Sequence, residues 1–195
     1  MFRRLRLQFI MIASLAILFI LVFTVGIINT VRSFQTEQEI SKVLNTLTEN
    51  NGSFGKTKKI ETNQGREIPS DSFRFFSVTL SDDKIVSQDT SHTSLINDEE
   101  AARYALTVSR LTNNLGTIRE KNINLSYQVS KVSKDKILVV FLDTTSYYNS
   151  SQALLSISIL LSMFGFIFFV VIVSALSGIV IRPFIRNYEK QRRFI

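Results

Sequence analysis

Two long stretches of this chain are almost entirely apolar, and they divide it into five parts. Residues 9–28 contain no charged residue and no proline. At about 1.5 Å per residue, a helix of this length spans roughly 30 Å, the thickness of a bilayer's hydrocarbon core. Residues 153–181 form a second uncharged stretch rich in Phe, Ile, Leu and Val. Neither stretch has the polar face of a helix in a soluble protein, so the pattern predicts transmembrane helices over residues 9–31 and 153–181.

The first stretch could also be the core of a secretory signal peptide, because Arg3, Arg4 and Arg6 precede it. It is, however, longer than the usual core of such a peptide. Residues 26–30 also lack the small-x-small pattern of a cleavage site. We therefore expect an uncleaved membrane anchor.

The segment between the two stretches, residues 32–152, has the mixed pattern of a folded domain. Ile40, Val43, Leu44 and Leu47 have the spacing of one helix face, so the first helix is predicted to continue beyond the membrane. The sequence Asn-Asn-Gly at 50–52 is expected to end it. A polar stretch then runs through residue 72 and predicts a loop with one short strand.

Alternation in residues 74–80 predicts a strand, with Phe76, Val78 and Leu80 on one side and Phe75, Ser77 and Thr79 on the other. The pair Asp82-Asp83 predicts a turn, and residues 84–88 a returning strand.

A second helix is predicted to begin at Asn97, because Asn97 followed by Glu100 is a capping pattern. The spacing of apolar residues predicts the buried face of this helix and the two strands that follow it. The face comprises Ala101, Tyr104, Ala105, Val108 and Leu111, and the strands cover residues 125–130 and 137–142. The continuous apolar run at 137–142 is typical of a central strand covered on both faces. The order helix, two strands, helix, two strands predicts an α+β domain with an antiparallel sheet, the arrangement expected of a small PAS-like extracytoplasmic sensor domain.

The distribution of charge predicts the orientation of the chain. Residues 1–8 carry three Arg and no acid, and residues 182–195 carry five basic residues and Glu189, which gives +3 and +4. Residues 29–152 carry fifteen basic and fifteen acidic residues, so the whole net charge of +7 lies in the two flanks. The positive-inside rule places both flanks in the cytoplasm. A neutral folded domain also argues against nucleic acid as a partner.

Catalytic and metal-binding patterns are scarce in this sequence. The chain has no cysteine and one histidine, His92, which excludes disulfides, thiolate metal sites and multi-histidine metal sites. His92 lies in a polar segment, residues 89–94, that predicts a loop in which Asp89 and His92 could take part in sensing. Asp82, Asp83 and Asp89 could contribute to a cation site, but they lack the spacing of a calcium loop and fit solvated turns better.

Small residues recur in the second apolar stretch, at Ser158, Ser162, Gly165, Ser174 and Gly178. Such residues let membrane helices approach closely, and two spans per subunit would then form a four-helix bundle in a homodimer. The same residues are also tolerated in membrane helices without any packing role.

The end of the chain is its most distinctive part. Residues 182–195 read Arg-Pro-Phe-Ile-Arg-Asn-Tyr-Glu-Lys-Gln-Arg-Arg-Phe-Ile. Pro183 predicts a break at the membrane surface, and the spacing of Phe184, Tyr188 and Arg192 predicts a new helix after it. A short natural tail whose charge only fixes the topology remains an alternative.

This segment resembles the one that runs directly into the phosphoacceptor helix in membrane sensor histidine kinases of Gram-positive bacteria that lack a HAMP linker. Residues 74–80, 89–92 and 136–143 also resemble the sensor domains of these kinases. The resemblance implies a signal-transmitting linker that includes Arg182, Pro183, Tyr188 and Glu189. It also implies a homodimer in the bacterial cell membrane that responds to an extracellular ligand or membrane protein.

The motifs that carry kinase chemistry are absent from this sequence. It has no phosphoacceptor box, no Asn-rich ATP-binding motif and no Gly-rich ATP lid, and His92 lies on the wrong side of the membrane. The resemblance therefore implies a sensing and transmitting region without catalytic residues. ATP, Mg²⁺ and the response regulator would bind a kinase region after Ile195. The alternatives are a non-enzymatic two-pass receptor that recruits a cytoplasmic partner, and an enzyme whose active site lies in the outer domain.

Overall fold

The computed structural model describes the backbone of residues 2–62, 65, 67–120 and 123–192; the side chains of residues 2, 3, 5 and 178–192 lie outside the description. The chain forms two compact units. Unit one comprises Met1–Val31 and Gln152–Ile195, and unit two comprises Arg32–Ser151.

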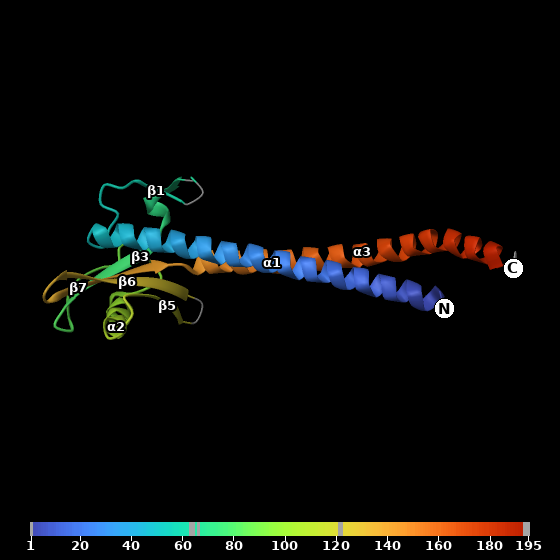
Figure 1. Cartoon of the computed structure of the whole chain (residues 1–195). Helices are drawn as coiled ribbons and strands as arrows, with labels where there is room; N and C mark the ends of the chain where they lie inside the picture. The colour runs from blue at the N-terminus through green and yellow to red at the C-terminus, as the bar shows by residue number, and fades with distance from the viewer. Residues whose placement is uncertain (1, 63–64, 66, 121–122, 193–195) are drawn as a thin grey trace. The chain divides into compact units, whose positions relative to one another are not determined.

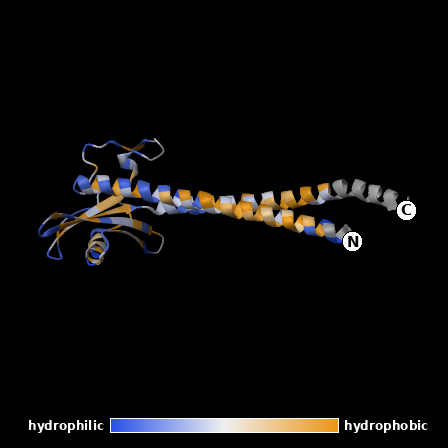
Figure 2. Ribbon diagram, in the orientation of Figure 1, coloured by the Kyte–Doolittle hydropathy of each residue, from blue (hydrophilic) through white to orange (hydrophobic). Residues whose placement is uncertain are grey.

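Unit one consists of parts of the two longest helices, α1 (Phe2–Glu49) and α3 (Thr145–Arg192). Both are long and apolar enough to cross a membrane, and their most apolar windows contain no fully buried residue. Figure 2 shows the apolar residues concentrated along these parts of α1 and α3. The predicted stretches 9–31 and 153–181 thus lie within continuous helices.

The break expected at Pro183 does not occur, because α3 continues through this residue to Arg192. Proline removes one helical hydrogen bond, but its φ angle is compatible with a helix. The new helix expected after Pro183 is therefore a continuation of α3.

Unit two is built on a five-stranded antiparallel sheet with the order β4-β3-β7-β6-β5 (Figure 1). The strands are β3 (Phe75–Ser81), β4 (Lys84–Asp89), β5 (Leu115–Glu120), β6 (Ile123–Ser133) and β7 (Lys136–Asp143). Helix α2 (Asp98–Ser109) connects β4 to β5. The last strand, β7, lies at the centre of the sheet between β3 and β6, as its apolar sequence predicts.

One face of the sheet packs against α2. Phe76 and Phe141 lie at the centre of this core with their rings stacked at a centroid distance of 4.6 Å. The capping box predicted for α2 is present: the backbone N–H of Glu100 donates to Asn97 Oδ1 at 2.8 Å, and the backbone N–H of Asn97 donates to Glu100 Oε2 at 3.2 Å. The buried residues of this core are Phe76, Val78, Leu80, Ile96, Ala101, Tyr104, Ala105, Val108, Leu125, Tyr127, Val139 and Phe141.

The other face packs against the end of α1 that belongs to unit two. The predicted apolar face of α1 is buried here together with three alternate residues of β7, which are Leu138, Val140 and Leu142. A two-stranded hairpin, β1 (Lys59–Glu61) and β2 (Glu67–Pro69), is followed by a short 3-10 helix, η1 (Ser70–Ser72). The remaining buried residues of this core are Ile40, Val43, Leu44, Leu47, Phe54, Ile60, Phe73 and Phe75.

Helix α1 ends at the predicted Asn-Asn-Gly sequence. Asn51 and Gly52 have φ angles of 56° and 86°. The N–H of Gly52 donates to the carbonyl of Leu47 at 2.8 Å, and the N–H of Asn51 donates to that of Thr48 at 3.2 Å. These two bonds form a Schellman motif, which satisfies the last helical carbonyls.

Three details of the domain differ from the sequence-based expectation. Strand β5 was not predicted, and the loop before β3 contains two short strands rather than one. Leu111 is 50% exposed, because α2 ends at Ser109 and leaves it outside the helical face.

We predict that Phe141→Ala destabilises unit two by about 3–5 kcal/mol, because it empties the centre of the α2-side core. Hydrogen–deuterium exchange of the full chain in vesicles would measure this as faster exchange in β6 and β7. The control is Val132→Ala on β6, where the side chain is 52% exposed and the change should stay within about 0.5 kcal/mol. Equal protection in the two variants would contradict the core assignment.

Candidate functional site

The loop predicted for sensing lies between β4 and α2 and is held by local hydrogen bonds. Ser91 donates to Asp89 Oδ1 through its backbone N–H at 3.0 Å and its hydroxyl at 2.6 Å. Thr90 Oγ1 donates to Asp98 Oδ1 at 2.7 Å, which joins the loop to the first turn of α2. The loop is thus fixed at both of its ends.

His92 lies on the surface of this loop and covers the buried Phe75. The two rings stack with a centroid distance of 4.4 Å and an interplanar angle of 16°. Phe75 in turn makes an edge contact with Phe54 at 5.0 Å, in the core on the α1 side. The structure therefore brings His92 against the hydrophobic core and close to Asp89.

The pKa of the Asp89 carboxyl lies below its ordinary value of 3.8. The main cause is the hydrogen bond from the Ser91 hydroxyl, followed by the bond from its backbone N–H and the positive charge of His92. Asp89 is exposed, so this arrangement orders the loop rather than creating an acid or base for catalysis. Within the described part of the chain, no cluster of His, Cys, Asp and Glu suits a metal ion.

A lowered folded-state pKa means that ionised Asp89 stabilises the fold above pH 3.8, and that this contribution is lost as the pH falls through the folded-state value. We expect the thermal midpoint of the wild type to exceed that of Asp89→Asn at neutral pH. The difference should shrink as the pH falls from about 5 to about 3. In a Ser91→Ala background the pH dependence of the difference should be much smaller. A pH-independent difference would refute this account.

The small residues predicted to pack helices have different environments within unit one. Ser158, Ser162 and Ser174 are half-buried, whereas Gly165 is exposed, with open space around it. Gly178 lies outside the described side chains and burial.

One face of each long helix is covered by the other within unit one. The guanidinium of Arg6 on α1 donates to the backbone carbonyl of Ser174 on α3 at 2.8 Å. Covered positions recur every three or four residues, as expected for packed helices. They are Ile10, Ala13, Ser14, Ile17, Leu21 and Val25 on α1, and Leu155, Ser158, Ser162, Phe166, Phe169, Val170, Val173, Ser174 and Ser177 on α3.

Ser158 and Ser162 are therefore among the covered positions of α3. The hydroxyls of Ser14 and Ser177 are buried in this unit without a hydrogen-bond partner.

The residues of the predicted linker, Arg182, Pro183, Tyr188 and Glu189, all belong to α3. Their side chains lie outside the described ones, so their roles stay predictions.

Sequence reasoning missed a hydrogen-bonded junction between the sheet and α3. Thr144, between β7 and α3, is fully buried; its hydroxyl lies 3.1 Å from that of Ser126 on β6 and donates to the carbonyl of Asn124 at 3.0 Å. The backbone N–H of Asn124 donates to Thr145 Oγ1 at 2.9 Å. The N–H of Thr145 donates to Asp143 Oδ1 at 2.9 Å, which caps the first turn of α3. The sheet is thus joined to α3 through several bonds.

Two further contacts hold the first turn of α3 in unit two. Tyr147 Oη donates to Glu39 Oε1 on α1 at 3.2 Å. The guanidinium of Arg119 on β5 lies 5.2 Å from the centre of the Tyr148 ring, a cation–π geometry. The start of α3 therefore contacts α1 as well as the far edge of the sheet.

A signal for this junction existed in the sequence. Asp143-Thr144-Thr145 follows an apolar strand, and such residues are good helix caps. The contacts with Ser126 and Asn124 could not be predicted, because they depend on the sheet register that places Ser126 opposite Leu142.

No protein-family model matches this sequence, and no curated protein matches it.

Proposed function

We propose that this chain is the membrane-anchored sensor region of a two-component histidine kinase. The observation that carries the proposal is the course of α3, which begins at the hydrogen-bonded junction after the central strand β7 and continues to the basic segment without a break. A change in the sheet would move the start of α3. An uninterrupted helix would pass that movement to whatever follows its inner end.

Membrane insertion is the first part of the proposal. Side chains on the uncovered faces of α1 and α3 are apolar and exposed; Phe19 is 72% and Leu161 is 71% exposed. Exposed apolar surface of this extent requires lipid or another apolar partner. The charge of the two flanks, +3 and +4, supports cytoplasmic termini and an outer location for unit two. The chain would thus be a two-pass protein of the bacterial cell membrane.

A PAS-like identity for unit two is the second part. The strand order β4-β3-β7-β6-β5, with helices on both faces, supports it. The His92 loop is the best candidate for contact with a stimulus, because it is exposed and yet packs on Phe75 at 4.4 Å. A ligand that displaces His92 would uncover the aromatic core beside β3.

The kinase identity is the third part, and the resemblance of residues 182–195 supports it. A kinase region after Ile195 would bind ATP and Mg²⁺ and transfer phosphate to a response regulator. A homodimer is expected, in which the two spans of each subunit form a four-helix bundle. Such a bundle, if bistable, needs a differential binding energy of only a few kcal/mol to change its state populations.

The topology is tested by labelling single cysteines with a membrane-impermeant maleimide, since the chain has no cysteine of its own. We expect Ser87→Cys to react in intact cells and Asn187→Cys to react only after permeabilisation. The reverse pattern would contradict the orientation. Release of the chain from membranes by alkaline carbonate would contradict insertion itself.

The kinase identity is tested by sequencing the native gene past the codon for Ile195 and assaying the encoded protein for autophosphorylation. We expect a His-Glu-Leu-Lys/Arg-Thr-Pro box followed by an ATP-binding domain. Thr144→Val should change the autophosphorylation rate severalfold, because it removes the buried hydroxyl that joins the sheet to α3. Thr107→Val is the matched control, because the Thr107 hydroxyl bonds only to its own helix. A stop codon or an unrelated domain would refute the kinase identity and favour a receptor that recruits a partner.

A further inference from the structure

Arg6 lies in the second turn of α1 and contacts α3 inside unit one. Its guanidinium donates to the backbone carbonyl of Ser174 at 2.8 Å. Ser174 precedes the end of the uncharged stretch 153–181 by seven residues. At about 1.5 Å per residue, the guanidinium thus meets α3 roughly 10 Å inside that stretch. In a chain inserted as proposed above, Arg6 would lie where the headgroup layer meets the hydrocarbon.

The sequence of unit one offers Arg6 no acidic partner nearby. Residues 1–31 contain no Asp or Glu, and residues 152–195 contain only Glu189. Glu189 follows Ser174 by fifteen residues on α3, about 22 Å along the helix axis. An arginine keeps its proton in a protein, and a charge at this depth is costly without a partner. An anion from outside the chain would therefore stabilise Arg6.

Hydrogen-bond donors exceed acceptors around this arginine. The bond to Ser174 uses one of the five N–H donors of the guanidinium. Helical carbonyls point toward the C-terminus of their helix, so the guanidinium lies beside the turn that contains Ser177. Ser177 is 3% exposed, and its hydroxyl has no hydrogen-bond partner among the described residues. A group with several acceptor oxygens would suit this excess of donors.

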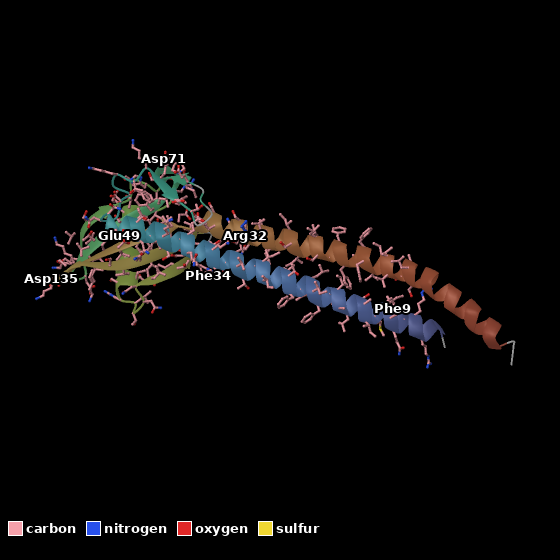
Figure 3. All side chains as sticks on the ribbon, turned by 45° about the horizontal axis from the view of Figure 1, so that its top comes forward. Phe9, Arg32, Phe34, Glu49, Asp71 and Asp135 are labelled. Atoms are coloured by element: carbon pink, nitrogen blue, oxygen red, sulfur yellow. The ribbon has the colours of Figure 1, made fainter. Side chains whose placement is uncertain are left out.

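An exposed aromatic side chain lies one turn from Arg6 on the same side of α1. Phe9 follows Arg6 by three residues and is 58% exposed (Figure 3). Residues three apart on a helix are neighbours on its surface. The apolar stretch of α1 begins at Phe9, so this ring lies closer to the middle of the bilayer than Arg6 does. A phospholipid has the same order, with its phosphate outside its acyl chains.

We propose that Arg6 and Phe9 bind an anionic phospholipid of the inner leaflet, with the phosphate on the guanidinium and an acyl chain over the ring. The inference rests on the proposed membrane insertion and orientation. Phosphate suits the guanidinium because its oxygens can accept two parallel N–H bonds. Phosphatidylglycerol is favoured over phosphatidylcholine, because choline would bring a second positive charge to the site.

The test measures how strongly brominated lipids quench a single introduced tryptophan, since the chain has no tryptophan of its own. Phe9→Trp places the probe at the site, and Phe19→Trp, at a position 72% exposed on the same helix, is the control. Each full chain is reconstituted in vesicles of phosphatidylglycerol and phosphatidylcholine in which one lipid or the other is brominated. We expect the Phe9→Trp probe to prefer phosphatidylglycerol about fivefold and the Phe19→Trp probe to show no preference.

Removal of the charge tests Arg6 directly in the Phe9→Trp chain. Arg6→Gln should abolish the preference for phosphatidylglycerol, because glutamine can still donate to the Ser174 carbonyl but carries no charge. Arg32→Gln, at the other end of the apolar stretch, is the matched control and should leave the preference unchanged. A preference that survives Arg6→Gln, or that Arg32→Gln lowers equally, would overturn the proposal.

The same vesicles separate failure of this site from failure of the proposed insertion. Equal quenching of Phe9→Trp by the two brominated lipids would refute the site and leave insertion intact. Absence of quenching by either lipid would refute insertion and the site together. Inorganic phosphate added to vesicles of phosphatidylcholine alone should leave the emission of Phe9→Trp unchanged. A change that Arg6→Gln removes would assign the site to free phosphate and overturn the lipid proposal.

Discussion

The double burial of β7 is the constraint on which the rest of unit two depends. Val139 and Phe141 point into the α2-side core, whereas Leu138, Val140 and Leu142 point into the core on the α1 side. A strand in this position must have both faces covered, which requires a helix on each side of the sheet. It also places the end of β7, and hence the start of α3, at the centre of the sheet rather than at an edge.

Features defined by local sequence could be predicted from the chain alone. The buried face of α1, the end of that helix at Asn51 and Gly52, and the capping box of α2 all depend on residues a few positions apart. Strand β5 could not, because its sequence is half-exposed and contains Gly116, which indicates a turn. In the fold this glycine makes room for Tyr127, whose hydroxyl would lie 2.6 Å from an added Cβ.

The candidate sites also combine features that local sequence predicts with features that only the fold determines. The polar loop around His92 was recognisable, but its stacking on Phe75 depends on how β3 and the loop meet in space. The hydroxyls of Ser126 and Thr144 are on residues that usually face solvent, and only the pairing of β6 with β7 buries them together. Contacts between residues far apart in sequence therefore determine how the sheet joins α3.

The sheet domain holds its two long helices to very different extents. It holds α1 through the buried positions from Ile40 to Leu47 and fixes its last turn with the Schellman motif. It holds α3 mainly through the first turn, at Thr144, Thr145 and Tyr147. A force on the sheet would therefore displace α3 more readily than α1, because the attachment of α3 is the shorter of the two.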